Sequence, residues 1–159
     1  VGSCGPPVCT GDVSQYCTAK FNSLGCLPFI TTSGTPSATA GNGYTVSCNN
    51  VLNNKAGLMF YGINGPANTV FQGGRLCVNT PIRRTPVFTS GGNPGGTDCS
   101  GVFSIDVNAF AVGALGGKPI PELQRAGTQG WAQFWGRAQG FPAPNNTTLS
   151  GGVTWTICD

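Results

Sequence analysis

Eight cysteines are the residues of this chain best suited to do chemistry, and their spacing decides which chemistry that is. Zinc sites and redox motifs use Cys-x-x-Cys pairs or cysteines combined with histidine, and this chain has no such pair and no histidine. An even count without metal spacing predicts disulfides made in an oxidising compartment. We therefore expect a secreted or cell-surface protein whose cysteines are all oxidised, namely Cys4, Cys9, Cys17, Cys26, Cys48, Cys77, Cys99 and Cys158.

The pairing of these cysteines is one choice among the many that eight residues allow. Neighbours in the sequence favour three local bridges, Cys4–Cys9, Cys17–Cys26 and Cys77–Cys99. The remaining two residues then form the long-range bridge Cys48–Cys158, which closes the largest loop.

Carboxylates are the second group that could carry chemistry, as a glycosidase pair or as calcium ligands. Asp106 with Glu122 is a conceivable pair, but nothing in the sequence marks them as partners. We expect Asp106 to cap or tether a loop at a strand end, and Asp98 to sit in a tight turn beside a disulfide. Because the lack of histidine also excludes Ser-His-Asp and Cys-His catalysis, we expect no enzyme activity, no metal and no cofactor.

The segment "GWAQFWGR" brings aromatic and amide side chains together on one predicted strand. Alternate residues of a strand point to opposite faces, so one face fills the core and the other leaves an aromatic ring near Gln129. Such a ring can stack on a sugar. Alternatively it can lie under a loop or against a neighbouring subunit, and we favour this alternative because exposed apolar patches most often mark protein contacts. The candidate glycan-contact or interface residues are Trp131, Gln133, Phe134, Trp135 and Arg137.

The stretch "NNTT" contains two overlapping N-glycosylation acceptors, Asn145 and Asn146. In a host that glycosylates asparagine, this loop would lie on the protein surface. Otherwise it is an Asn/Thr-rich turn.

Short runs of alternating apolar and polar residues, separated by Gly- and Pro-rich turns, predict the strands that position these groups. Together they indicate an all-β fold, a β-sandwich or jelly-roll-like set of antiparallel sheets with long Gly/Pro-rich loops and disulfide staples. Residues 1–16 are predicted to be an extended N-terminal arm, and residues 17–159 a single domain. The predicted strands are 28–32, 43–49, 57–62, 75–79, 86–89, 102–107, 130–136 and 151–158.

Charge is scarce, since charged residues make up 8% of the chain, and the basic residues are scattered. Nucleic-acid binding needs a clustered basic surface, so we do not expect a nucleic-acid partner. No stretch approaches the roughly 20 apolar residues of a membrane span. The chain begins at Val1 without an initiator methionine and is expected to be already processed.

Five stretches resemble an uncharacterised module of secreted bacterial proteins: "YCTAKFNSLGCLPFI", "GLMFYG", "FQGGRLCVNTPIRRTP", "DCSGVFSIDVNAFA" and "WGRAQGFPAPNNTTLS". The resemblance implies secretion and modularity, and it implies no catalytic residues. In the pattern that this chain resembles, a cysteine stands where this chain has Ala132, and an aspartate often stands where it has Ala138. The missing cysteine implies a change in disulfide pairing.

Two functions from different classes remain. The first is a structural subunit of an extracellular filament or surface array, in which the N-terminal arm reaches a neighbouring copy head to tail. Low charge favours it because close-packed subunits then repel each other weakly. The second is a secreted carbohydrate-binding or adhesion module with glycans as partners, built on the strand that holds Trp131 and Trp135.

Overall fold

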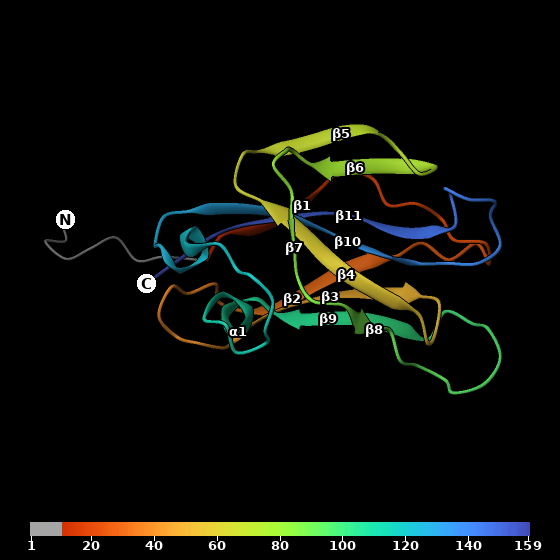
Figure 1. The fold of residues 1–159 in the computed structure, drawn as a ribbon, viewed down its shortest axis with the longest axis horizontal. Helices are drawn as coiled ribbons and strands as arrows, with labels where there is room; N and C mark the ends of the chain where they lie inside the picture. The colour runs from red at the N-terminus through yellow and green to blue at the C-terminus, as the bar shows by residue number, and fades with distance from the viewer. Residues whose placement is uncertain (1–10) are drawn as a thin grey trace, which may run out of the picture.

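The computed structural model describes residues 11–159, which form an antiparallel β-sandwich, so the predicted all-β fold is confirmed (Figure 1). Its helical segments are short: α1 (Val107–Ala111) and the 3-10 turn η1 (Pro121–Gln124). No helix within residues 11–159 is long and apolar enough to cross a membrane. The strands are β1 (Val13–Tyr16), β2 (Phe29–Gly34), β3 (Tyr44–Val51), β4 (Ala56–Gly62), β5 (Pro66–Phe71), β6 (Gly74–Val78), β7 (Arg83–Arg84), β8 (Phe88–Thr89), β9 (Gly101–Asp106), β10 (Gln129–Arg137) and β11 (Thr147–Thr156).

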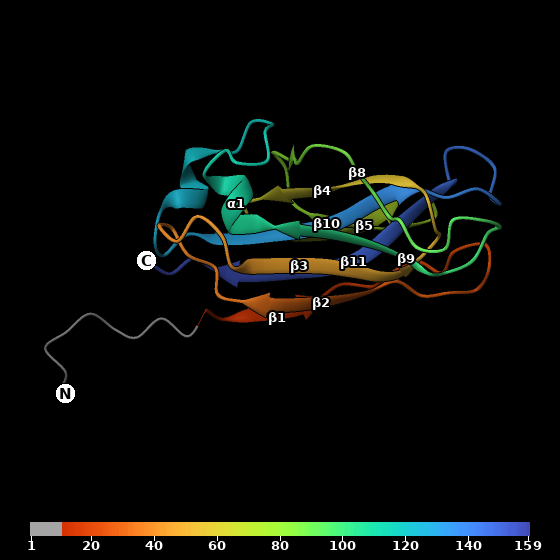
Figure 2. The same ribbon diagram turned by 90° about the horizontal axis from the view of Figure 1, so that it is seen from below.

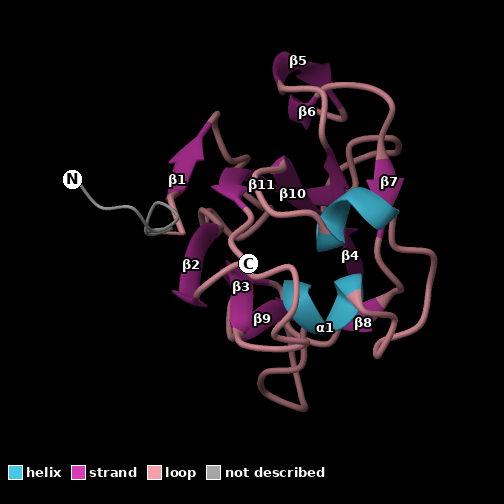
Figure 3. Cartoon of the chain, turned by 90° about the vertical axis from the view of Figure 1, so that its left-hand side faces the viewer, coloured by secondary structure: helices cyan, strands magenta, loops and turns pink. Residues whose placement is uncertain are grey.

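The strands form three layers (Figure 3). The middle layer is the large sheet, in the order β1-β11-β10-β4-β7, with β8 also paired to β4. The small sheet, in the order β2-β3-β9, covers one face of it, and the β5-β6 hairpin covers part of the other face. The large sheet is therefore packed on both faces, and each packing layer has its own apolar cluster.

The main core lies between the large and small sheets and is supplied by alternate residues of their strands. A second, smaller cluster of Leu58, Phe60 and Val78 lies under the hairpin, with Leu76 partly buried against it. The alternating pattern predicts ten core residues, and all lie in or against one of these clusters: Val46, Phe60, Leu76, Val78, Phe103, Ile105, Val107, Val153, Trp155 and Ile157. Those in the main core are Val46, Phe103, Ile105, Val107, Val153, Trp155 and Ile157.

Two glycines bring the sheets together around Phe103 of β9. A Cβ atom added to Gly57 of β4 or to Gly136 of β10 would lie 2.5 Å from the Phe103 ring. The ring therefore rests directly on the backbone of the large sheet, and no side chain fits between them. This contact explains the glycines of "GLMFYG" and "WGR".

The disulfides differ from the predicted local pairs. Cys17 is bonded to Cys77 and Cys26 to Cys99, with separations of 60 and 73 residues, so the predicted Cys17–Cys26 and Cys77–Cys99 bridges are wrong. Tyr16 ends the edge strand β1 and Cys17 follows it, and the Tyr16 hydroxyl donates a hydrogen bond to the carbonyl of Cys77. The hairpin strand β6 packs on β10 and β11 of the large sheet, and this packing, not sequence distance, places Cys77 beside Cys17.

Cys48 is a free thiol, so the prediction that all eight cysteines are oxidised is also wrong. It points from β3 into the main core and is fully buried, and burial raises the pKa of its thiol. Cys158 is disulfide-bonded, which rules out the predicted Cys48–Cys158 pair. Ala132, the position where the resembling module has a cysteine, belongs to the same buried core cluster as Cys48.

Part of the predicted arm belongs to the sandwich. Val13–Tyr16 form β1, which pairs antiparallel with β11 in the register Val13↔Trp155 to Tyr16↔Gly152. The predicted boundary at residue 16 therefore falls at the end of an edge strand. Residues 1–10 of the predicted arm, and with them the predicted Cys4–Cys9 bridge, lie outside the described residues.

Candidate functional site

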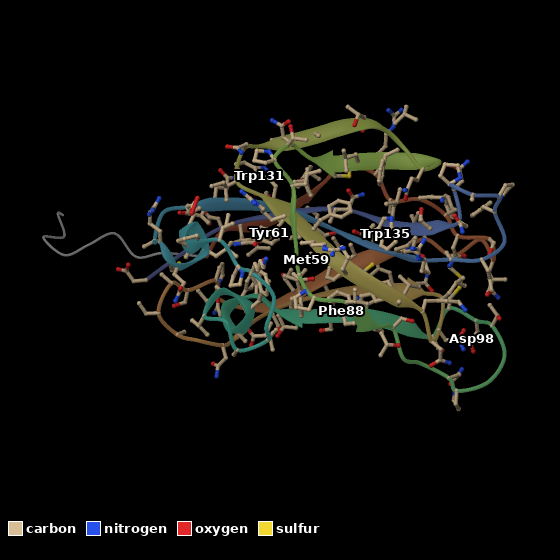
Figure 4. The ribbon with its side chains drawn as sticks, viewed as in Figure 1. Met59, Tyr61, Phe88, Asp98, Trp131 and Trp135 are labelled. Atoms are coloured by element: carbon tan, nitrogen blue, oxygen red, sulfur yellow. A yellow bond between two sulfur atoms is a disulfide. The ribbon has the colours of Figure 1, made fainter. Side chains whose placement is uncertain are left out.

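The strand β10 divides its side chains between the two faces of the large sheet. Ala132 and Phe134 face the main core and are fully buried. Phe134 was predicted as a candidate ligand contact, but its side chain is not accessible to a ligand. Trp131, Gln133 and Trp135 face the hairpin side. Figure 4 labels the two tryptophans at separate positions along this strand.

Gln133, between the two tryptophans, is a buried clamp and not the surface contact that the sequence predicted. Its Oε1 accepts a hydrogen bond from the amide of Cys77 (3.0 Å). Its Nε2 donates to the carbonyls of Arg75 and Ser150, each at 2.8 Å. Because β6 covers Gln133, the two tryptophans do not form one continuous aromatic platform.

Trp135 lines an open cleft of about 340 Å³ beside the hairpin. The floor is apolar and comes from β4 and β5, chiefly Phe60 and Phe71. The indole Nε1 donates to Oε1 of Gln72 at 2.9 Å, which fixes the ring. The guanidinium carbon of Arg137 lies 4.9 Å from the centre of the same ring, a cation–π contact.

The rim of this cleft is cationic. Arg83 and Arg84 of β7 are exposed and line it, and Arg84 stands opposite Phe60 in the β4–β7 pairing. Within residues 11–159, none of Arg83, Arg84 and Arg137 forms an ion pair with a carboxylate. Sequence reasoning missed Arg84, Phe71 and Gln72 as cleft residues, because only the β4–β7–β10 pairing brings them beside Trp135.

The carboxylates have structural roles, as expected. Asp106 is the N-cap of α1: its carboxylate accepts from the amide of Ala109 at 3.0 Å and from that of Gly43 at 2.8 Å. Asp98 lies next to the Cys26–Cys99 bridge and accepts from Ser100 and from the Asn93 side chain. Hydrogen bonds from Ser100 and Asn93 lower the pKa of Asp98. No group of three or more His, Cys, Asp or Glu residues gathers anywhere in the described chain.

The predicted glycosylation loop is fastened by Lys20. This buried ammonium donates to the carbonyls of Gln72, Asn145 and Thr147, and it lies 4.9 Å from the centre of the Phe141 ring. All three N–H donors are thus occupied, which makes Lys20 a tie between three loops. The acceptor Asn145 is exposed, and Asn146 is partly exposed.

The small sheet has two open edges within residues 11–159, β2 and β9, since no further described strand pairs with either. Each is six residues long. The β2 sequence "FITTSG" contains no charged residue, and "GVFSID" of β9 has one, the capping Asp106. The β7 edge of the large sheet differs from these two edges in length and charge, because β7 is two residues long and both residues are arginines.

Comparisons with family models, with curated proteins and with solved structures give no match to this chain. The functional argument therefore rests on the cleft at Trp135 and on the open edges of the small sheet.

Proposed function

We propose that this protein is a structural subunit of an extracellular filament or surface array and that it assembles with copies of itself. The observation that carries the proposal is the pair of open, nearly uncharged edges of the small sheet. Disulfides form and persist in oxidising compartments, and the Cys17–Cys77 and Cys26–Cys99 bridges support an extracellular setting.

Exposed edge strands invite pairing with another chain, and monomeric proteins usually protect them with lysine, proline, bulges or very short strands. Here β7 has such protection in Arg83 and Arg84, whereas β2 and β9 are six residues long and contain no lysine, arginine or proline. The exposed face next to these edges also presents apolar groups, with Phe29 53% and Val102 39% exposed. This pattern favours a protein whose small sheet is meant to meet another copy.

Sedimentation and negative-stain microscopy of the purified, unreduced chain test the proposal. We expect regular polymers whose amount rises with protein concentration, and dissociation into folded monomers on dilution. A chain that sediments as a monomer at high concentration would refute it.

A carbohydrate-binding or adhesion module is the second candidate, favoured by the cleft at Trp135. An apolar floor with a fixed indole, an amide and arginines at the rim can take a sugar ring and its substituents. The contact residues in this version are Trp135, Phe71, Gln72 and Arg84.

A glycan array separates the two functions. Binding that is lost in Trp135→Ala but kept in Trp131→Ala, the matched change on the far side of Gln133, would support the second candidate. An array without any binding would exclude it and leave the structural proposal untouched.

A further inference from the structure

The edge of β9 has free backbone groups at Ser104. In an antiparallel ladder the N–H and C=O of alternate residues point to opposite sides. The amide of Val102 donates to the carbonyl of Ser90 at 2.7 Å, on the side away from β3. Ser104, two residues on, therefore presents its N–H and C=O on that outer side too, and neither has a hydrogen-bond partner among the described residues.

The edge of β2 has the same arrangement at Thr32. The carbonyl of Ile30 accepts from Nε2 of Gln15 at 2.9 Å, so even-numbered residues of β2 point away from β3. Thr32 lies two residues after Ile30, so its backbone groups also point away from β3, and Gln15 does not bond to them. Its outward N–H and C=O are unpartnered within residues 11–159.

The two edges fit each other. Both β2 and β9 pair antiparallel with β3, so they run in the same direction. They lie on opposite sides of the sandwich: β1 and β2 run along one side, and β8 lies on the other side with β9 (Figure 2). We propose that β9 of one copy pairs in parallel with β2 of the next copy, so that the small sheet continues from subunit to subunit.

A groove beside β9 would receive side chains of the incoming strand. It has a volume of about 350 Å³, and its lining includes Ser104, Ile105 and Asp106 of β9 together with Val87 and Leu115. Val87 is 65% and Leu115 45% exposed, and both would be covered by the added strand. The contact is head to tail, because it uses different surfaces on the two copies, and it propagates unless it closes into a ring.

This inference rests on the proposed self-assembly and names the surfaces that carry it. Ser104→Pro and Thr32→Pro each remove one outward N–H, a position where proline is tolerated on an edge strand. The matched controls Ser104→Ala and Thr32→Ala keep the N–H; the first removes the side-chain hydroxyl, and the second removes the hydroxyl and a methyl group. We expect the proline variants to raise the concentration needed for polymers by about ten-fold or more, because each loses an intermolecular backbone hydrogen bond. The alanine variants should polymerise like the parent.

Cross-linking gives a readout that does not depend on the proline variants folding. Ser104 and Thr31 both lie on the exposed outer face, in the same row across the sheet. A mixture of Ser104→Cys and Thr31→Cys chains should form a covalent dimer under mild oxidation, and neither variant alone should do so.

The outcomes are distinct. Polymers that form equally well in the proline variants, or a cross-link in Ser104→Cys alone through β9–β9 pairing, would overturn the inference while self-assembly stands. A parent chain that stays monomeric at all concentrations would overturn both. Loss of polymers in the proline variants only, together with the mixed cross-link, would support both.

Discussion

Replacing Gln133 by alanine removes the clamp that holds the hairpin to the large sheet. The side chain is fully buried and makes three hydrogen bonds, all to backbone groups of β6 and β11. A net contribution of about 1 kcal/mol for each bond gives ~3 kcal/mol, before any cost of leaving the partners unsatisfied. We expect Gln133→Ala to lower the free energy of unfolding by about 3–5 kcal/mol, and Gln133→Glu to do at least as much. In the glutamate variant a carboxylate oxygen would face the carbonyls of Arg75 and Ser150.

Denaturation in urea without reductant gives the free energy, and hydrogen exchange locates the change. The amide of Cys77 should exchange much faster in either variant, while amides of the β3–β9 ladder should keep their relative protection. Gln129→Ala, on the same strand but exposed, is the control and should lie within about 0.5 kcal/mol of the parent. A loss below about 1 kcal/mol in Gln133→Ala would refute the idea that this residue docks the hairpin.

Three further results are expected. Tyr44→Phe should stabilise the protein by about 1 kcal/mol, because the buried Tyr44 hydroxyl has no hydrogen-bond partner among residues 11–159; a loss in a urea titration would contradict this. Burial raises the pKa of Tyr44, so its unfolded form ionises first and the Tyr44 contribution to stability, intact below pH about 10, should be lost by ~1.4 kcal/mol per pH unit above it. The raised pKa values of Cys48 and Tyr16 add to the total slope in the same direction. Urea midpoints from pH 9 to 11 measure that slope, and the idea fails if Tyr44→Phe does not flatten it. Gly136→Ala should cost about 1–3 kcal/mol by thermal melting, because its Cβ would lie 2.5 Å from the Phe103 ring, and an unchanged melting temperature would contradict the packing.

The long alternating strands were predictable from the sequence, because burial on one face leaves a two-residue period. The predicted 102–107 and 130–136 coincide with β9 and β10 to within a residue or two, and 151–158 matches the second half of β11. The strands β1, β5 and β7 were missed. They lie at edges or in the hairpin and are largely exposed, so no alternating pattern marks them.

The disulfides and the cleft could not be read from the sequence for a common physical reason. Cys17 meets Cys77 because the hairpin packs on the large sheet, and Trp135 and Arg84 line one cleft because β10 and β7 both pair with β4. Local spacing carries no information about such pairings. The roles of Asp98 and Asp106 were predictable because a turn and a helix cap are local structures.

The scarcity of charge acquires a specific meaning once the sheets are known. A chain with five acidic and eight basic residues has few charges with which to protect its edges. Two of the basic residues lie on β7, the edge strand next to the cleft, and β2 has no charged residue. A charge on an edge strand opposes pairing with another chain. The single charge on the two edges of the small sheet is Asp106, which ends β9 and caps α1. The lack of any other charge on these edges, which share direction and length, is consistent with the pairing that we propose.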